Sequence, residues 1–334
     1  MNSVQVIAEI GQAHDGSVGM LHSLINAIAG TGVAAIKFQM HIADAESCAQ
    51  DEFRIPFSQV DATRMDYWRR MELSLAQWYE VKSHCEDLGC EFLCTPFSIA
   101  AVAQLEALGV ARYKVGSGDT SNALLLDALG ATGKPVILSS GMSSYNELDA
   151  AVERLMQRGS RVSVMQCTSE YPVLPERWGL NVLAEIRDRY GVPYGLSDHS
   201  GSIVPGLAAA ALGATLIEVH ATFDRRMFGP DATSSLTIDE LAQLVRDVSS
   251  IRTALDHPVD KGDAEDMARM RRLFGRSLTV RRDMAAGEVL SFDDLECTKP
   301  AGLGVPPQAY EQLIGRRLKR ALSLRSFIME EDIE

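Results

Sequence analysis

Short β-rich runs alternate with helix-like segments over roughly the first 255 residues of this chain. Each run is followed by an amphipathic or Ala-rich stretch, and glycines such as Gly89 and Gly109 stand just before the next run. This alternation is typical of repeated βα units, in which helical crossovers join parallel strands. Eight such units predict a (β/α)8 TIM barrel. The expected strands are residues 4–11, 34–40, 90–96, 112–117, 135–141, 162–168, 193–199 and 216–222.

Polar or ionisable residues stand at the carboxyl ends of all eight expected strands. In a barrel of this kind the active site forms at those ends. Upstream residues are mainly Val, Ile, Leu, Phe and Ala, which suit a packed interior. One such side chain alone would cap a strand or lie in a solvated loop, but eight ends out of eight predict a functional site. The set comprises Glu9, Lys37, Gln39, Thr95, Lys114, Ser117, Ser139, Thr168, Ser169, His199, Glu218 and His220.

Two of the expected strands end on histidines, His199 and His220, and an Ala-rich segment at 204–212 lies between them. If that segment is a crossover helix, both imidazoles reach the same edge of one parallel sheet. Imidazole is the commonest side-chain ligand of divalent transition ions. The pair therefore predicts a metal with positions left for substrate, and the simpler alternative is two unrelated buried histidines. Glu9, in the same ring of strand ends, is a candidate general base or a residue that orients a substrate hydroxyl.

Lysines and hydroxyl groups at the strand ends predict an anion site. Lys37 and Lys114 supply positive charge, while Thr95, Ser117 and Ser139 supply short directional donors. A lysine at such a position is alternatively a Schiff-base nucleophile or a surface residue. Because the histidines already offer a metal, binding of a phosphate or carboxylate is the more economical role.

The connection at residues 41–71 is long for a βα loop and carries several charged residues, including Asp44, Glu46 and Arg54. Loops of this size are uncommon unless they cover a site or mediate contacts. We therefore expect a lid or an oligomer contact here.

The balance of charges disfavours two classes of partner. With 45 acidic and 32 basic residues among 334, the net charge is −13, which disfavours nucleic acid and anionic membranes.

No apolar run approaches the roughly 20 residues that span a bilayer. The first residues begin a strand rather than a signal peptide, and the six cysteines contain no CxxC pair. We expect a cytoplasmic protein with reduced thiols.

The character of the chain changes after residue 255. A polar, charged stretch leads into brief β-like pieces separated by turns such as Ala286-Gly287. We expect the barrel at residues 1–262, a linker at 263–276 and a small β-rich domain at 277–334. About 60 residues is small for an independent core, so this domain is expected to lean on the barrel or on another subunit.

Motifs in both parts resemble a known family. In the barrel they are AEIGQAHDGS (8–17), IKFQ (36–39), YKVGSGDTSN (113–122), ILSSGM (137–142), QCTSEYP (166–172), GLSDHSG (195–201) and EVHATFDRRMFGPDATSSL (218–236). In the second domain they are SLTVRRDMAAGEVLSFDDLECTKPAGLGVPP (277–307) and IGRRLKR (314–320). The first set resembles the sialic acid synthase family, which includes the N-acetylneuraminate, legionaminate and pseudaminate synthases. The second set resembles the antifreeze-like (SAF) domain that ends those enzymes.

The resemblance implies a C–C bond-forming transferase. Its substrates would be phosphoenolpyruvate and an N-acyl aldose, such as N-acetylmannosamine or a 2,4-diacetamido sugar, and its products a nonulosonic acid and phosphate. A divalent metal, Mn²⁺ or Mg²⁺, would be held by His199 and His220, which with Glu9 are the implied catalytic residues. Residues that match the phosphoenolpyruvate site are Lys37, Thr95, Lys114, Ser117, Ser139, Ser169 and Ser197. Residues that match the sugar site are Glu9, Gln39, Tyr171, Glu218 and Asp231.

The resemblance also implies a domain-swapped homodimer. In such a dimer the SAF domain of one chain caps the barrel of the other and contributes a cation to the sugar. Several members of the family use an arginine followed by Pro-Gly, whereas this chain reads Lys-Pro-Ala from Lys299 onward. Lysine lacks the planar fork of arginine, so the substitution bears on which sugar is bound.

Two other functions stay open. A synthase of the sialic acid 9-phosphate type would use a 6-phosphosugar and would need a further phosphate site at the sugar end, of which the sequence gives no obvious sign. A non-catalytic carbohydrate-binding or ice-binding protein is the alternative from another class. Such a protein would have no reason to carry Glu9, Lys114, His199 and His220 at strand ends.

Overall fold

The computed structural model describes residues 4–55, 57–262 and 265–334 and consists of two compact units, Met1–His257 and Pro258–Glu334. The sequence suggests a division after residue 262 with a linker at 263–276. In the structure the division falls after His257, and helix α11 (Ala268–Phe274) occupies part of the expected linker.

The first unit is a closed parallel β-barrel. Strand β1 pairs with β2 on one side and with β8 on the other, and the strands between follow in chain order. The (β/α)8 prediction is therefore confirmed. The barrel strands are β1 (Gln5–Glu9), β2 (Ala35–Met40), β3 (Glu91–Pro96), β4 (Tyr113–Val115), β5 (Val136–Ser139), β6 (Val162–Cys167), β7 (Tyr194–Asp198) and β8 (Leu216–Thr222). A short strand, β9 (Leu236–Thr237), pairs in parallel with the end of β8.

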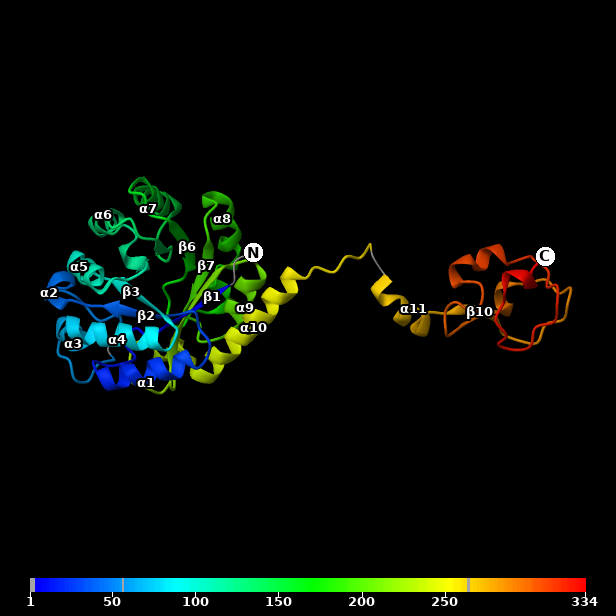
Figure 1. The fold of residues 1–334 in the computed structure, drawn as a ribbon, viewed down its shortest axis with the longest axis horizontal. Helices are drawn as coiled ribbons and strands as arrows, with labels where there is room; N and C mark the ends of the chain where they lie inside the picture. Colours follow the sequence, from blue (N-terminus) through cyan, green and yellow to red (C-terminus); the bar gives the residue numbers. More distant parts are fainter. Residues whose placement is uncertain (1–3, 56, 263–264) are drawn as a thin grey trace. The chain divides into compact units, whose positions relative to one another are not determined.

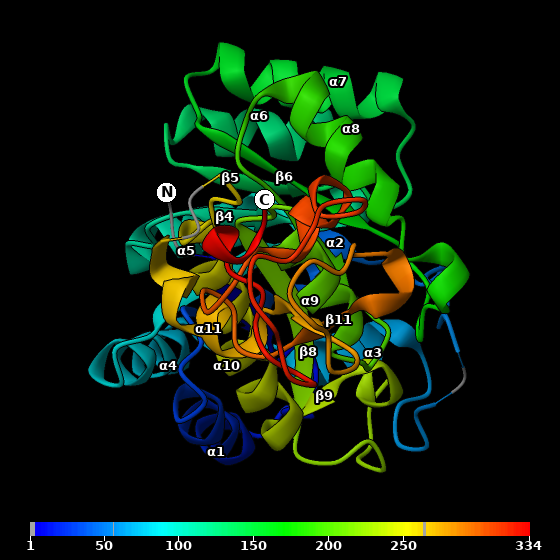
Figure 2. The same ribbon diagram turned by 90° about the vertical axis from the view of Figure 1, so that its right-hand side faces the viewer.

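Helices surround the barrel on its outside. The views in Figures 1 and 2 place α6, α7 and α8 on one side of the strands and α1 on the opposite side. The helices that follow the strands are α1 (Val18–Ala29), α4 (Leu75–Asp87), α5 (Ile99–Leu108), α6 (Ala123–Ala131), α7 (Tyr145–Gln157), α8 (Leu180–Tyr190), α9 (Val204–Ala211) and α10 (Ile238–Asp256). Side-chain N-caps start several of them, for example Ser74 and Ser144, each in a complete capping box.

Inward-facing side chains of the strands form layers, because successive residues of a strand point to opposite faces. One buried layer is apolar and consists of Ile7, Ala35, Leu93, Ile137, Met165 and Leu216. Two positions further along the same strands stand the buried residues Glu9, Lys37, Thr95, Ser139, Cys167 and Glu218. The polar residues thus form the layer next to the apolar one inside the barrel, and the apolar layer packs beneath them.

Strands β2, β3 and β8 end at the predicted residue, and the other five barrel strands end one or two residues earlier. The run expected at 112–117 contains only three residues in β4, because the chain turns into a 3₁₀ helix at Ser117–Asp119. His199 lies one residue beyond the end of β7.

The long connection after β2 contains two helices, α2 (Ala43–Glu46) and α3 (Arg64–Met71), before α4 begins.

The second unit has its own core. Strand β10 (Ser277–Val280) pairs antiparallel with β11 (Leu295–Thr298), and buried leucine, isoleucine, valine and methionine side chains pack around them. Among the described residues of the whole chain, no helix is both long and apolar enough to cross a membrane.

Candidate active site

A pocket of about 660 Å³ lies at the carboxyl ends of the barrel strands. Glu9 lies directly behind the lining, where it contacts Lys37 and Gln39. Lys299 belongs to the second unit, where its Nζ lies 5.0 Å from the ring centre of Phe274, and its role stays a prediction. Predicted site residues that line the pocket are Lys37, Gln39, Thr95, Lys114, Ser117, Ser139, Ser169, Tyr171, Ser197, His199, Glu218, His220 and Asp231.

Two lysines and two carboxylates form a buried network at the base of the pocket. Lys37 Nζ lies 2.5 Å from Glu9 Oε2 and 3.6 Å from Glu218 Oε1, while Lys114 Nζ lies 3.5 Å from the same Glu218 oxygen. Lys114 also donates to Ser139 Oγ at 2.6 Å, and Lys37 donates to Thr95 Oγ1 at 3.3 Å. Each ammonium is thus held in place by an oxygen on a neighbouring strand.

Charge pairing and burial set the protonation of this network. Burial raises the pKa of Glu218, but the charges of Lys114 and Lys37 outweigh it and hold the pKa below its usual value. For Lys114, burial is the largest effect and lowers the pKa, against the opposing charge of Glu218. An anionic ligand beside Lys114 would stabilise its charged ammonium form against the effect of burial, so the network favours anion binding.

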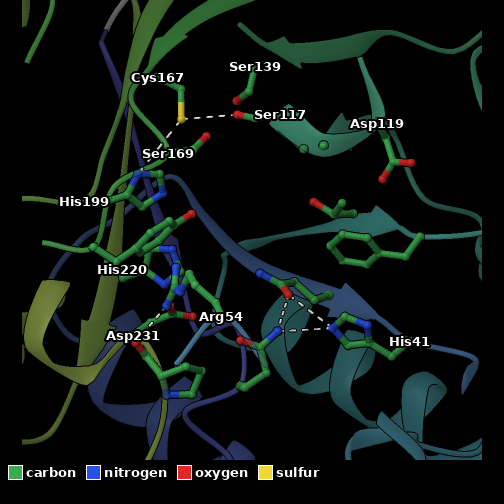
Figure 3. Close-up of a pocket in the computed structure, with 18 of the residues that line it drawn as sticks. His41, Arg54, Ser117, Asp119, Ser139, Cys167, Ser169, His199, His220 and Asp231 are labelled. Carbon is green, nitrogen blue, oxygen red and sulfur yellow. Dashed lines mark hydrogen bonds and ion pairs between the residues drawn. The ribbon is translucent and has the colours of Figure 1, made fainter. Parts of the chain in front are cut away.

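Hydroxyl groups gather at one end of the pocket, as Figure 3 shows for Ser117, Ser139 and Ser169 near Cys167. Ser117 Oγ lies 3.4 Å from Cys167 Sγ. Gly141 makes room for them, because a Cβ there would lie 1.9 Å from Ser117 Oγ and 2.8 Å from Ser169 Oγ. These donors, next to Lys114, suit the oxygens of a phosphate or carboxylate.

The two predicted metal ligands lie side by side. The ring centres of His199 and His220 are 5.2 Å apart, and Tyr171 packs on His199 with a ring distance of 4.1 Å. His199 Nδ1 lies 3.0 Å from the carbonyl oxygen of Thr168. A carbonyl can only accept, so Nδ1 carries the proton and Nε2 keeps its lone pair. Burial lowers the pKa of both histidines, which favours the neutral form that binds metals.

The histidine pair fits a divalent ion that takes its other ligands from substrate and water. In the described part of the chain, no group of three or more His, Cys, Asp or Glu side chains is arranged to hold a metal. The carbonyl of Thr168 orients His199 in the way that backbone groups commonly orient metal-binding histidines. A metal at this position would take its nitrogen ligands from His199 and His220.

The connection after β2 forms one wall of the pocket. Arg54 reaches across to donate to Asp231 Oδ1 at 2.9 Å, and its guanidinium lies 3.9 Å from the ring centre of Tyr171. His41, at the start of the same connection, lies across the pocket from His199 in Figure 3. The structure therefore shows this segment covering part of the site, one of the two roles expected for it.

Several residues that line the pocket were not predicted as site residues. They come mostly from the long connection, whose length was the signal that it belongs to the site. They include Gln12, His41, Glu46, Arg54, Trp68 and Asp119.

Comparisons with known proteins show the family to which the chain is similar. Residues 24–260 match the model of the NeuB family, and residues 275–334 match the SAF domain. An N,N'-diacetyllegionaminic acid synthase of Legionella pneumophila is 31% identical over 338 residues, covering 98% of this chain and 94% of that protein. An N-acetylneuraminate-9-phosphate synthase of Mus musculus is 31% identical over 333 residues, covering 98% of this chain and 92% of that protein.

A solved structure supports the same relationship. The N-acetylneuraminic acid (sialic acid) synthetase of Leptospira borgpetersenii, in complex with citrate, superposes with a TM-score of 0.70 at 29% identity. The match covers 80% of this chain and 90% of that chain. Because the family model spans well over half of the sequence, this protein belongs to the NeuB family and carries a C-terminal SAF domain.

Proposed function

We propose that this protein condenses phosphoenolpyruvate with an N-acyl aldose to give a nonulosonic acid and phosphate, with Mn²⁺ or Mg²⁺ bound at His199 and His220. The observation that carries the proposal is the meeting, in one pocket, of a lysine-rich anion site and a neutral histidine pair. The names of the relatives in Legionella pneumophila and Mus musculus, both synthases of such acids, support it.

Phosphoenolpyruvate would occupy the anion site. Lys37 and Lys114 would face its carboxylate and phosphate, and Ser117, Ser139 and Ser169 would donate to the oxygens. Thr95 and Ser197 hold Lys37 and Glu218 in position through hydrogen bonds of 3.3 and 3.1 Å. The rigid network would fix the enol carbon C3 at a defined distance from the histidines.

The reaction joins C3 of phosphoenolpyruvate to the aldehyde carbon of the open-chain sugar. The aldehyde oxygen takes a proton and becomes a hydroxyl, water adds to C2, and the C2–O bond to phosphate breaks. A divalent ion would supply polarisation of the aldehyde. Glu9 would hold or move a proton. It is fully buried and paired with Lys37, and Gln39 donates to its Oε1 at 2.7 Å.

The sugar would lie between the histidines and the long connection. Tyr171 and Asp231 would contact it from the histidine side and Gln39 and Glu218 from the strands. The proposal includes a homodimer in the cytoplasm, in which Lys299 of one chain reaches the sugar bound by the other chain.

Phosphate release tests the proposal directly. The protein with phosphoenolpyruvate and Mn²⁺ should release phosphate only when an acceptor sugar is added, and a chelator should stop the release until Mn²⁺ is restored. The panel of sugars should contain N-acetylmannosamine, its 6-phosphate and 2,4-diacetamido-2,4,6-trideoxymannose. Binding of these sugars without any phosphate release would instead favour the carbohydrate-binding alternative.

A further inference from the structure

Glu46 is a buried carboxylate beside the pocket, and only one of its two oxygens has a hydrogen-bond partner among the described residues. It ends helix α2 and lines the pocket, and its side chain is only 8% exposed. Its Oε1 lies 2.7 Å from His41 Nδ1. Its Oε2 is buried and has no hydrogen-bond partner among the residues that the structure describes. A buried carboxylate oxygen without a donor is costly. Because Glu46 lines the pocket, a ligand that displaces the atoms now covering Oε2 could supply that donor.

The surroundings hold Glu46 in one orientation. The ring of His41 is stacked between Trp68 and Phe97, with ring centres 4.1 and 4.7 Å away and planes within 19° and 10° of parallel. A carboxylate can only accept, so His41 donates to Glu46 through Nδ1. With the imidazole fixed on both faces, the carboxylate has little freedom to turn its second oxygen elsewhere.

Hydrogen bonds connect this position to the proposed sugar site. His41 Nε2 lies 3.1 Å from Gln39 Oε1 and 3.2 Å from Gln12 Nε2. Gln39 in turn donates to Glu9 at 2.7 Å. Glu46 therefore stands at the outer end of a continuous chain of polar contacts that begins at the proposed proton-handling group.

This part of the pocket is acidic. Besides Glu46, the carboxylates of Asp51 and Asp119 line it. Burial raises the pKa of Asp119, and the negative charge of Glu46 also raises it. The two carboxylates are therefore close enough to repel one another. The cations of the same wall are already paired, Arg54 with Asp231 at 2.9 Å and Arg64 with Asp51 at 3.2 Å.

We propose that Glu46 is a specificity-determining residue whose free oxygen accepts a hydrogen bond from an N–H or O–H of the sugar. This inference rests on the proposed function and narrows its substrate to an uncharged N-acylated sugar. If the phosphate of a phosphosugar lies beside Glu46 and Asp119, the two carboxylates would repel it, and Arg54 and Arg64 are already paired with aspartates.

Kinetics with charged and uncharged sugars test the inference. The Mn²⁺-loaded wild-type protein should use N-acetylmannosamine or 2,4-diacetamido-2,4,6-trideoxymannose with a kcat/KM at least about tenfold above that for N-acetylmannosamine 6-phosphate. Glu46→Gln keeps an acceptor for His41 but replaces the free oxygen by a donor. Its KM for the uncharged sugar should rise about tenfold or more, its KM for phosphoenolpyruvate should not change, and its discrimination against the phosphosugar should shrink.

Asp44→Asn is the matched control. Asp44 lies on the same short helix, is 77% exposed and pairs with Arg69 at the surface, so both KM values should equal those of the wild type. The melting temperature of Glu46→Gln should stay within a few degrees of the wild type, because the hydrogen bond to His41 is kept. An unchanged sugar KM in Glu46→Gln, or a wild-type preference for the phosphosugar, would overturn the inference.

Calorimetric titration separates this inference from the proposed function. If no sugar supports phosphate release, the proposed function fails, yet binding of N-acetylmannosamine and its 6-phosphate can still be compared in wild type and Glu46→Gln. Tighter binding of the uncharged sugar that weakens in Glu46→Gln supports the role of Glu46. Equal binding of both sugars to both proteins contradicts it.

Discussion

His199 and His220 are kept neutral by burial, and one of them is oriented by a backbone carbonyl. Replacing His220 by alanine removes one of the two nitrogen ligands proposed for the metal. We expect turnover to fall by more than about 100-fold and Mn²⁺ affinity to drop in parallel, because a single imidazole holds the ion poorly. Calorimetric Mn²⁺ titration and phosphate release at saturating metal measure the two effects.

The control for this change is His257→Ala, since His257 is exposed at the end of α10. It should bind Mn²⁺ and turn over like the wild type. Undiminished activity of His220→Ala in a metal-saturated assay would remove His220 from the metal site.

Lys114 is the cation whose loss should weaken anion binding most. Its ammonium is 3% exposed and contacts Ser139 and Glu218. In Lys114→Ala the carboxylate of Glu218 loses one of the two lysine charges that balance it. Phosphoenolpyruvate loses a charge-assisted hydrogen bond of about 1.5–3 kcal/mol. We expect the KM for phosphoenolpyruvate to rise about 10- to 100-fold while the sugar KM changes little.

Steady-state kinetics with each substrate varied in turn check this prediction. Lys134→Ala serves as the control, because Lys134 pairs with Glu106 on the outside of the barrel. Unchanged kcat and KM in Lys114→Ala would place Lys114 outside the site.

At the scale of elements, the strands were easier to predict than the connection after β2. Glu9, Lys37 and Glu218 each stand two residues beyond an apolar inward-facing residue, so the two-residue period of a strand places them in the pocket. Glu46 lies on a helix of four residues, which is too short to show a period. Its partner His41 is held by stacking on Trp68 and Phe97, tertiary contacts that local sequence does not encode.

The turn after β5 gives an element-scale prediction. Gly141 has no room for a side chain, because a Cβ would lie 2.1 Å from Ser117 Cβ and 1.9 Å from its hydroxyl oxygen. In Gly141→Ala the 3₁₀ helix that carries Ser117 must move, which should cost about 1–3 kcal/mol of stability and raise the KM for phosphoenolpyruvate at least about tenfold.

Thermal unfolding and initial rates measure these two effects. Gly19→Ala is the matched control, since Gly19 is exposed in α1 and a Cβ there meets only Ser17 Oγ at 3.9 Å. That variant should be as stable as the wild type or slightly more stable. A fully active Gly141→Ala would show that Ser117 and Ser169 need not close around the substrate.

At the scale of the whole molecule, the chain consists of two units with separate cores. The apolar clusters of the barrel lie within Met1–His257, and the cluster around Leu278 and Val280 lies within Pro258–Glu334. Because each core is complete within its own unit, a chain that ends at His257 should fold and keep the barrel. Under the proposed function it should nevertheless lose turnover, since it lacks the lysine expected to reach the sugar.

Complementation tests whether that lysine acts between chains. His220→Ala has an intact second unit but a defective barrel site, whereas Lys299→Ala has the reverse. If the SAF domain serves the barrel of its partner, each mixed dimer contains one complete site, so co-expression of the two inactive variants should restore about a quarter of the wild-type activity. If each chain serves itself, the mixture should stay inactive, and full activity of Lys299→Ala alone would show that the sugar does not need this cation. Since the two substitutions lie in separate units, recovery cannot come from mutual repair of one folding defect.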